Sequence, residues 1–287
     1  MSTKTIYAGA HQHSIESVNG EFITREALVK AVPVIGNDGT NHNMTDRYIP
    51  ISTMELIDIL EEAGFGVVSA FQSKPHTRPN NRNKLAHARH CVRFRNPNLS
   101  SLFNGEEDFE IVALNSFNGQ TQLEMSTGVF RPVCSNGMVV GDTCSSAAIR
   151  HIGEKASIMT EAVQIIDSAP EVADMVSRMK GTLLRPKQMT DMAKGIAAVR
   201  FGDDDIERIN FQEMLKPLRS ADTGKDVWTI FNRLQEKVIK GGIAREIIDG
   251  GEGSPTQRTS SRLKNPVEII RVNRESWDVA ESFLETV

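Results

Sequence analysis

The stretch that decides the fold is "EIVALNSFNGQTQLEMS", residues 110–126. EIVALNS and QTQLEMS are runs of strand length, the second with alternating residues in LEMS, and the dipeptide Asn118-Gly119 stands between these two runs. An Asn-Gly pair between alternating runs is the strongest short-range signal for a β-hairpin, because both residues of a type I′ turn need a positive φ. The stretch therefore predicts two antiparallel strands, 110–116 and 120–126.

Further strands surround this hairpin. The dipeptide Asn136-Gly137 repeats the turn signal, and the proline-containing loop KPHTRPNNRN separates another pair of alternating runs. The strands predicted beside these links are 67–73, 85–95, 128–134 and 138–142. Because short links require antiparallel pairing, we expect a meander of about five strands within residues 66–142.

Helical periodicity dominates the rest of the chain. The segment 53–65 repeats apolar residues at helical spacing and closes on Gly64, and a shorter helix is expected from Thr24 to Val32. After Asp142 the predicted helices are 156–168, 170–179, 185–202, 226–242 and 274–286. The expected fold class is α+β: an antiparallel sheet with a long packed helix, followed by a helical C-terminal half.

Three regions are expected along the chain. An N-terminal segment, 1–23, precedes an α+β core, 24–180, which is followed by a helical region, 181–287. Within the helical region, residues 245–266 are rich in glycine and polar residues, which is typical of a mobile loop.

Composition restricts the classes of protein and of chemistry. A hydrophobic fraction of 39% and a charged fraction of 24% are ordinary for a globular protein. The chain begins without an apolar signal segment and contains no run long enough to span a membrane, so we expect a cytoplasmic location in the host cell and no membrane contact. Its three cysteines form neither a disulfide framework nor a metal-binding pair, and the common nucleotide, zinc-protease and serine-hydrolase motifs are missing. We expect no cofactor and no metal ion.

One stretch is strongly basic although the formal net charge is -4. Between Gln72 and Arg95 no acidic residue occurs, and the basic residues are Lys74, Arg78, Arg82, Lys84, Arg89, Arg93 and Arg95. Side chains alternate along a strand, so the last three arginines are expected on one face, exposed to solvent, with Val92 and Phe94 on the other. Guanidinium groups suit phosphate, and a local excess of positive charge attracts polyanions. The simpler interpretation is a solvated outer face.

Two further groups of residues are candidates for a site. The late segment carries Arg258, Arg262 and Lys264 among hydroxyl residues, which suits contacts with a phosphate backbone or, alternatively, a soluble linker. Cys134, just before the Asn-Gly turn, is a candidate nucleophile if a base such as His151 lies close to it. No sequence spacing brings such a base within reach, so the alternative is a structural cysteine.

Several segments resemble a known family. They are DRYIPISTMELIDILEEAGF, HARHCVRFR, IVALNSFNGQTQLEMSTGVFRPVCSNGMVVGD, RHIG, DVWTIFNRLQEKVIKGG and RVNRESWDVAE, and they extend from about Thr24 to Glu281. In these segments the chain is similar to the phage, plasmid and prophage proteins grouped as domain of unknown function 932. The resemblance implies a mobile-element setting rather than a particular reaction. In the order of its elements the chain is also similar, in outline, to Rad52-like phage annealing proteins.

The favoured function is binding or annealing of single-stranded DNA, without catalysis. Aromatic residues near the basic strand are few, so contacts with the backbone phosphates are expected to dominate over base stacking. One alternative is an inhibitor or modulator of a host defence system, in which the same basic residues meet an acidic host protein. A second alternative is an enzyme that uses Cys134. The sequence leaves open whether the chain forms a homo-oligomer.

Overall fold

The computed structural model describes most of the chain. The described residues are 13–17, 20–37, 50–73, 87–104, 106–117, 121–131, 138–139, 146–149, 157–247 and 256–284. The chain divides into two compact units. The first consists of residues 1–130, 144–170 and 264–267, and the second of residues 131–143, 171–263 and 268–287.

An antiparallel sheet organises the first unit. In the described part of the chain it has seven strands, in the order β1-β2-β3-β4-β5-β6, with β7 also paired to β5. The strands are β1 (Ser14–Glu16), β2 (Gly66–Gln72), β3 (His90–Arg95), β4 (Asp108–Asn115), β5 (Leu123–Phe130), β6 (Met138–Val139) and β7 (Ser146–Ile149), and all of them except β6 belong to the first unit. Five of them lie within residues 66–142, so the predicted meander is confirmed. One detail differs, because β5 continues through Gly128, where two separate strands were expected.

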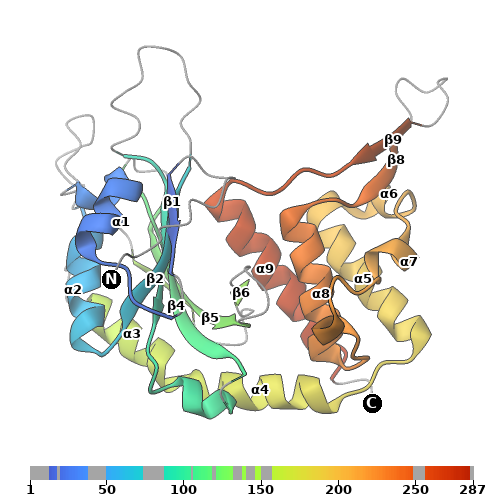
Figure 1. Ribbon diagram of the computed structural model, residues 1–287, viewed down its shortest axis with the longest axis horizontal. Helices are drawn as coiled ribbons and strands as arrows, with labels where there is room; N and C mark the ends of the chain where they lie inside the picture. Colours follow the sequence, from blue (N-terminus) through green and yellow to red (C-terminus); the bar gives the residue numbers. More distant parts are fainter. Residues whose placement is uncertain are drawn as a thin grey trace. The chain divides into compact units, whose positions relative to one another are not determined.

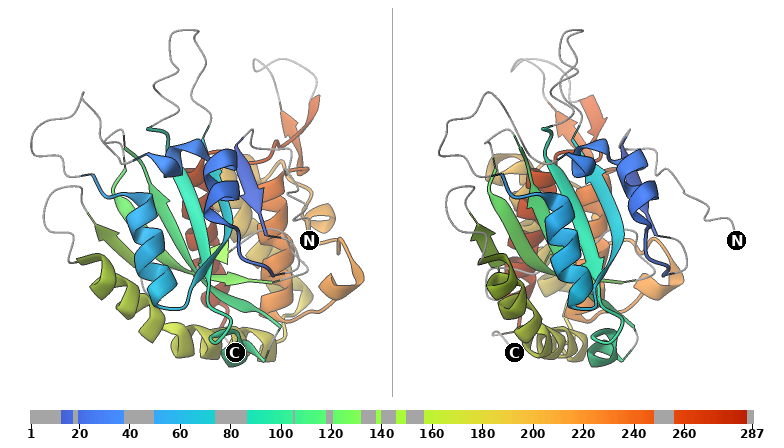
Figure 2. Two further views of the ribbon diagram at one scale, coloured as in Figure 1. Left: turned by 60° about the vertical axis from the view of Figure 1, so that its left-hand side comes forward. Right: turned by 90° about the vertical axis from the view of Figure 1, so that its left-hand side faces the viewer.

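Three helices cover one face of this sheet (Figures 1 and 2). They are α1 (Arg25–Ala31), α2 (Thr53–Glu62) and α3 (Ser157–Asp167), and short 3-10 turns occur at η1 (Pro33–Gly36) and η3 (Ser100–Phe103). The side chain of Thr24 accepts a hydrogen bond from the backbone of Ala27 and so caps α1, as its residue type predicts. The α+β fold class is confirmed.

Helices dominate the second unit. They are α4 (Ala169–Gly181), α5 (Pro186–Phe201), α6 (Asp203–Ile206), α7 (Phe211–Met214), α8 (Val227–Lys240) and α9 (Pro266–Glu281), with a 3-10 turn at η4 (Ser220–Asp222). The aromatic centre of this unit consists of Trp228, Phe231 and Trp277, whose ring centroids lie 5.8–6.1 Å apart. Edge-on aromatic pairs at such distances stabilise a core beyond the area that they bury.

A two-stranded ribbon follows α8 (Figure 1). It consists of β8 (Ala244–Ile247) and β9 (Thr256–Thr259), which form within the segment expected to be a mobile loop. Gly241 and Gly242 both have a positive φ, and a Cβ atom on Gly241 would lie 2.5 Å from the carbonyl oxygen of Ser260. The glycine pair therefore ends α8 and lets the chain before β8 approach the residues that follow β9.

The described helices include none that is long and apolar enough to cross a membrane.

Candidate functional site

The basic strand predicted from the sequence is β3. Arg93 and Arg95 lie on the same face of the sheet, as the alternation predicts, and both reach Glu110 on the neighbouring strand β4. The Nε atom of Arg93 donates to Glu110 at 2.6 Å, and Arg95 donates to the same carboxylate through two nitrogens, at 2.8 and 3.2 Å. Arg95 also pairs with Asp108 at 2.9 Å. Both guanidinium carbons lie over the ring of Phe130, at 4.7 and 4.8 Å from its centroid.

The expected exposure of these arginines is wrong. The side chains of Arg93 and Arg95 are 9% and 14% exposed, and that of Glu110 is 1% exposed. Burial alone would disfavour a charged guanidinium, but the carboxylate of Glu110 raises the pKa of Arg93 above its usual value. The two cations and the two carboxylates on β3 and β4 balance in charge. The strand is therefore a buried ion-pair ladder rather than a free phosphate-binding face.

Of the other five basic residues of this stretch, the structure describes one. Arg89 is partly buried just before β3. Lys74, Arg78, Arg82 and Lys84 lie outside the described residues.

The opposite face of β3 carries a buried polar network. His90 is completely buried, and its Nδ1 atom lies 2.9 Å from the carbonyl oxygen of Ala88, so Nδ1 carries the proton. Its Nε2 atom, 2.7 Å from the hydroxyl of Thr53, then accepts from that hydroxyl. Asn115 donates to the same hydroxyl at 3.1 Å and to the carbonyl oxygen of Ile51 at 2.9 Å. These bonds fix the start of α2 against the sheet and give the ALNS segment a structural role.

The described cysteine is not a nucleophile. Cys91 is a buried free thiol, and burial raises its pKa to about 12. A thiol that remains protonated reacts slowly, which is typical of a structural cysteine. Cys134 and its candidate base His151 lie outside the described residues.

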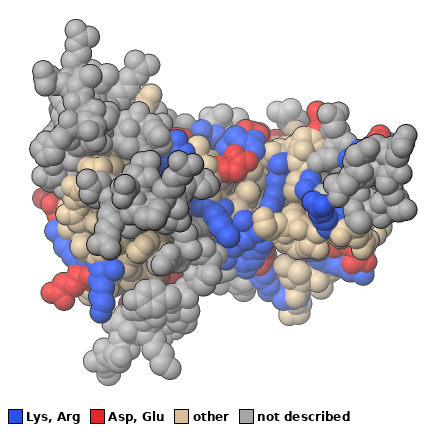
Figure 3. Space-filling view, turned by 90° about the horizontal axis from the view of Figure 1, so that it is seen from above, with Lys and Arg blue, Asp and Glu red and all other residues tan. Residues whose placement is uncertain are grey.

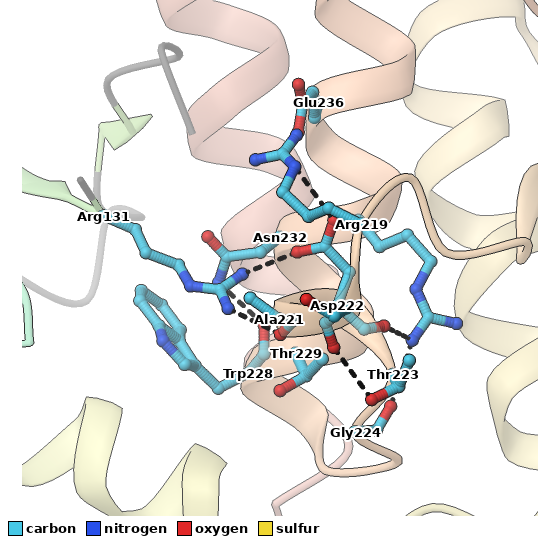
Figure 4. A network of polar contacts seen from close by, with 12 residues as sticks. Arg131, Arg219, Ala221, Asp222, Thr223, Gly224, Trp228, Thr229, Asn232 and Glu236 are labelled. Carbon is cyan, nitrogen blue, oxygen red and sulfur yellow. Dashed lines mark hydrogen bonds and ion pairs between the residues drawn. The ribbon is translucent and has the colours of Figure 1, made fainter. Parts of the chain in front are cut away.

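Polar contacts around Asp222 form a second buried network, shown in Figure 4. Arg131 donates to the Asp222 carboxylate at 3.0 Å and to the carbonyl oxygen of Ala221 at 2.8 Å. Arg219 pairs with Asp222 at 3.3 Å and also with Glu236, which in turn accepts from Lys240 at 2.5 Å. The Asp222 side chain is 3% exposed.

Basic side chains of α8 bind the loop that precedes this helix. Arg233 donates to the carbonyl oxygens of Leu215, Asp222 and Gly224, and Lys237 donates to two further carbonyls. Burial lowers the pKa of both side chains, and the positive charge of Arg233 lowers that of Lys237 further. Because the donors of this network are directed to protein acceptors, its role is to fix the loop from 213 to 224 on α8.

The ribbon carries a different arrangement of arginines. Arg245 on β8 lies directly opposite Arg258 on β9. The guanidinium carbon of Arg245 is 4.5 Å from the ring centroid of Phe201, at the end of α5, and that of Arg200 is 5.0 Å from the same centroid. Burial and then the positive charge of Arg245 lower the pKa of Arg200. We call Arg200, Arg245, Arg258 and Phe201 the ribbon cluster.

The sequence prediction identified only part of this cluster. Arg258 was predicted and is exposed, whereas Arg200 and Arg245 were missed. Arg200 donates to the carbonyl oxygens of Val238 and Ser261, so it ties the end of α5 to α8 and to the chain after β9. Of the other two residues predicted here, Arg262 is partly buried and Lys264 is exposed. Figure 3 shows Lys and Arg side chains, and some Asp and Glu side chains, among the described residues of the face seen from above.

The fold and these sites define an α+β protein with an antiparallel sheet, a separate helical unit and an arginine-bearing ribbon. The chain belongs to the family described as "Domain of unknown function (DUF932)", which it matches over residues 42–264. It is 31% identical to the UPF0380 protein YfjQ of Escherichia coli (strain K12) over 264 residues, which cover 91% of this chain and 92% of that protein. The UPF0380 protein YafZ of the same organism is 30% identical, with the same coverage. No solved structure matches the chain significantly.

Proposed function

We propose that this chain binds single-stranded nucleic acid through the phosphate backbone, in the setting of a phage or plasmid and without catalysis. The observation that carries the proposal is the ribbon cluster, in which the guanidinium groups of Arg200 and Arg245 lie over the ring of Phe201 and Arg258 stands opposite Arg245 in the ribbon. Backbone phosphates supply most of the affinity of non-specific nucleic-acid binding, and arginine is well suited to them. The basic segment 74–84, which lies outside the described residues, is a second candidate contact.

The ion-pair ladder on β3 and β4 makes the arginines of β3 unsuitable as a phosphate-binding surface. Arg93 and Arg95 already donate to Glu110 and Asp108, so a phosphate would have to displace two carboxylates in order to bind them. The exchange would break the charged contacts with Glu110 and Asp108 and replace them by similar contacts with phosphate, so it would gain little binding free energy. The ribbon cluster therefore replaces the strand as the proposed interface.

Fluorescence anisotropy with labelled oligonucleotides tests the proposal. Binding of oligothymidylate should weaken as salt increases, with roughly 0.7 added to the logarithmic slope for each phosphate neutralised. An unlabelled single strand should compete, whereas poly-glutamate should compete poorly. A lack of binding at low salt refutes the proposal. Binding that poly-glutamate abolishes as well as DNA does favours an acidic protein partner instead.

A further inference from the structure

We propose that copies of this chain associate head to tail, through a basic surface of the second unit and an acidic surface of the first. This association is independent of the proposed function. The basic surface lies where α4 leads into α5, and the sequence from 175 to 190 contains no acidic residue. It consists of one apolar residue and four exposed cations, namely Leu183, Arg178, Arg185, Lys187 and Lys225.

Local backbone contacts bring these residues together. The backbone of Leu184 donates to the carbonyl oxygen of Lys225 at 2.9 Å, so Lys225 lies beside the connection between α4 and α5. Leu183 and Arg185 are exposed and Leu184 between them is buried, so the first two leave the same side of an extended segment. The neighbouring carboxylate, Asp226, accepts from the backbone of Thr229 and caps α8. The surface therefore keeps an excess of positive charge.

Leu183 indicates which kind of partner this surface suits. It is the most exposed large apolar side chain of the described residues, at 72%. The four cations around it form no ion pair with any carboxylate in the described part of the chain. Burial of an exposed leucine stabilises a complex, and a phosphate backbone offers no apolar surface for it. An acidic protein surface with an apolar group of its own is the better complement.

The first unit carries such a surface on α2. Asp58, Glu61 and Glu62 are exposed and lie three and four positions apart, so they are neighbours on one face of the helix. Asp58, at 2.6 Å, and Glu61 share a single guanidinium group, that of Arg25, which leaves this face with an excess of negative charge. Phe22, 43% exposed, lies directly over the backbone just after the end of α2, at residue 66. We call Phe22 and the three carboxylates the acidic surface.

A second copy of the chain is therefore an occupant of the right chemistry for each surface. Opposite charges at the rim steer and orient the encounter, while Leu183 and Phe22 lose contact with water. Because the two surfaces differ, each contact leaves one of each kind free at the ends, and the association repeats as a ring or a filament. Such a small contact forms reversibly, so the association should depend on protein concentration and weaken with salt.

Sedimentation velocity without nucleic acid tests the association. The sedimentation coefficient of wild type should rise with protein concentration at low salt, and this rise should shrink as salt is added. The basic-surface variant, Arg185→Glu with Lys187→Glu, and the acidic-surface variant, Asp58→Asn with Glu62→Gln, should each lower the association constant by roughly tenfold or more. Leu183→Ser keeps every charge and should also weaken the association, because it removes the apolar contact.

A mixture of the two double variants is the sharpest measurement. Each variant alone lacks one working surface, but the mixture contains one complete pair: the acidic surface of the basic-surface variant and the basic surface of the acidic-surface variant. It should form a heterodimer and nothing larger. The control, Lys216→Glu with Lys264→Glu, changes the net charge as much as the basic-surface variant does, at two other exposed sites, and should assemble like wild type.

The possible results separate this association from nucleic-acid binding. A sedimentation coefficient of wild type that stays constant at low salt overturns the inference and leaves the proposed function standing. Assembly of both double variants like wild type, or a mixture without a complex, overturns it as well. A basic-surface variant that loses oligothymidylate binding while wild type stays monomeric assigns the basic surface to nucleic acid instead. If wild type associates as described but binds no oligonucleotide, the proposed function fails and the inference stands.

Discussion

Replacement of Glu110 by Gln tests the ion-pair ladder. In the wild type this carboxylate, 1% exposed, accepts one hydrogen bond from Arg93 and two from Arg95. The neutral amide would leave two guanidinium groups beside each other, with Asp108 still paired with Arg95. Loss of one partner from a buried ion pair costs about 3–5 kcal/mol of unfolding free energy. For a chain of this size, each kcal/mol lowers the melting temperature by roughly 2–4 °C, so we expect a decrease of about 10 °C.

Thermal unfolding followed by far-UV circular dichroism measures this change. Both tryptophans, Trp228 and Trp277, belong to the second unit, so tryptophan emission reports on that unit instead. Glu61→Gln is the matched control, because Glu61 is paired with Arg25 at an exposed site and its loss should leave the melting temperature unchanged. If Glu110→Gln melts together with wild type, the ladder is not buried and the arginines of β3 become available for a ligand again.

Three other predictions concern the thiol, the start of α2 and the ribbon. Cys91 should resist iodoacetamide in the native protein, which peptide mass spectrometry can check. The contribution of its protonated thiol to the free energy of unfolding is complete below the unfolded pKa of about 8.5 and is lost as the pH rises through about 12. Between these two pH values, Cys91→Ala should therefore lose less unfolding free energy than wild type does. Asn115→Ala should lower the free energy of unfolding by about 1–3 kcal/mol in urea titrations, because it leaves the buried carbonyl of Ile51 without this donor; an unchanged midpoint would contradict the network. Gly241→Ala should weaken oligonucleotide binding, since its Cβ would collide with the backbone of Ser260 and displace β8; equal binding by this variant would mean that the ribbon does not depend on that turn.

The fold could be predicted in large part because its signals are local. The Asn-Gly hairpin signal at Asn118-Gly119 predicts antiparallel pairing of the strands beside it, and this pairing is present as β4 and β5. Helix caps such as Thr24 act on residues three positions away. Extra strands in the late segment were missed because β8 and β9 have four residues each and are separated by a glycine-rich stretch.

The candidate site was harder to predict, because the sequence of one strand does not show which side chains the neighbouring strand places beside it. The pattern in β3 correctly predicted that Arg93 and Arg95 share a face, but their burial follows from Glu110, which the register of β4 brings beside them. The arginines of a strand without acidic residues, such as Arg93 and Arg95 of β3, can therefore still be neutralised by the neighbouring strand. Similarly, the contact of Arg245 with Phe201 joins residues that lie far apart in the sequence. The position of Arg245 shortly after the glycine pair Gly241-Gly242 was the available sequence signal for this cluster.

Arginine footprinting tests the central claim most directly. The protein would be treated with p-hydroxyphenylglyoxal, with and without oligothymidylate, and modified arginines would be located by peptide mass spectrometry. The account predicts that Arg258 is modified in the free protein and protected by the oligonucleotide, whereas Arg93 and Arg95 are unreactive in both states. Modification of Arg93 and Arg95 in the free protein, with protection on addition of the oligonucleotide and no protection of Arg258, would contradict it.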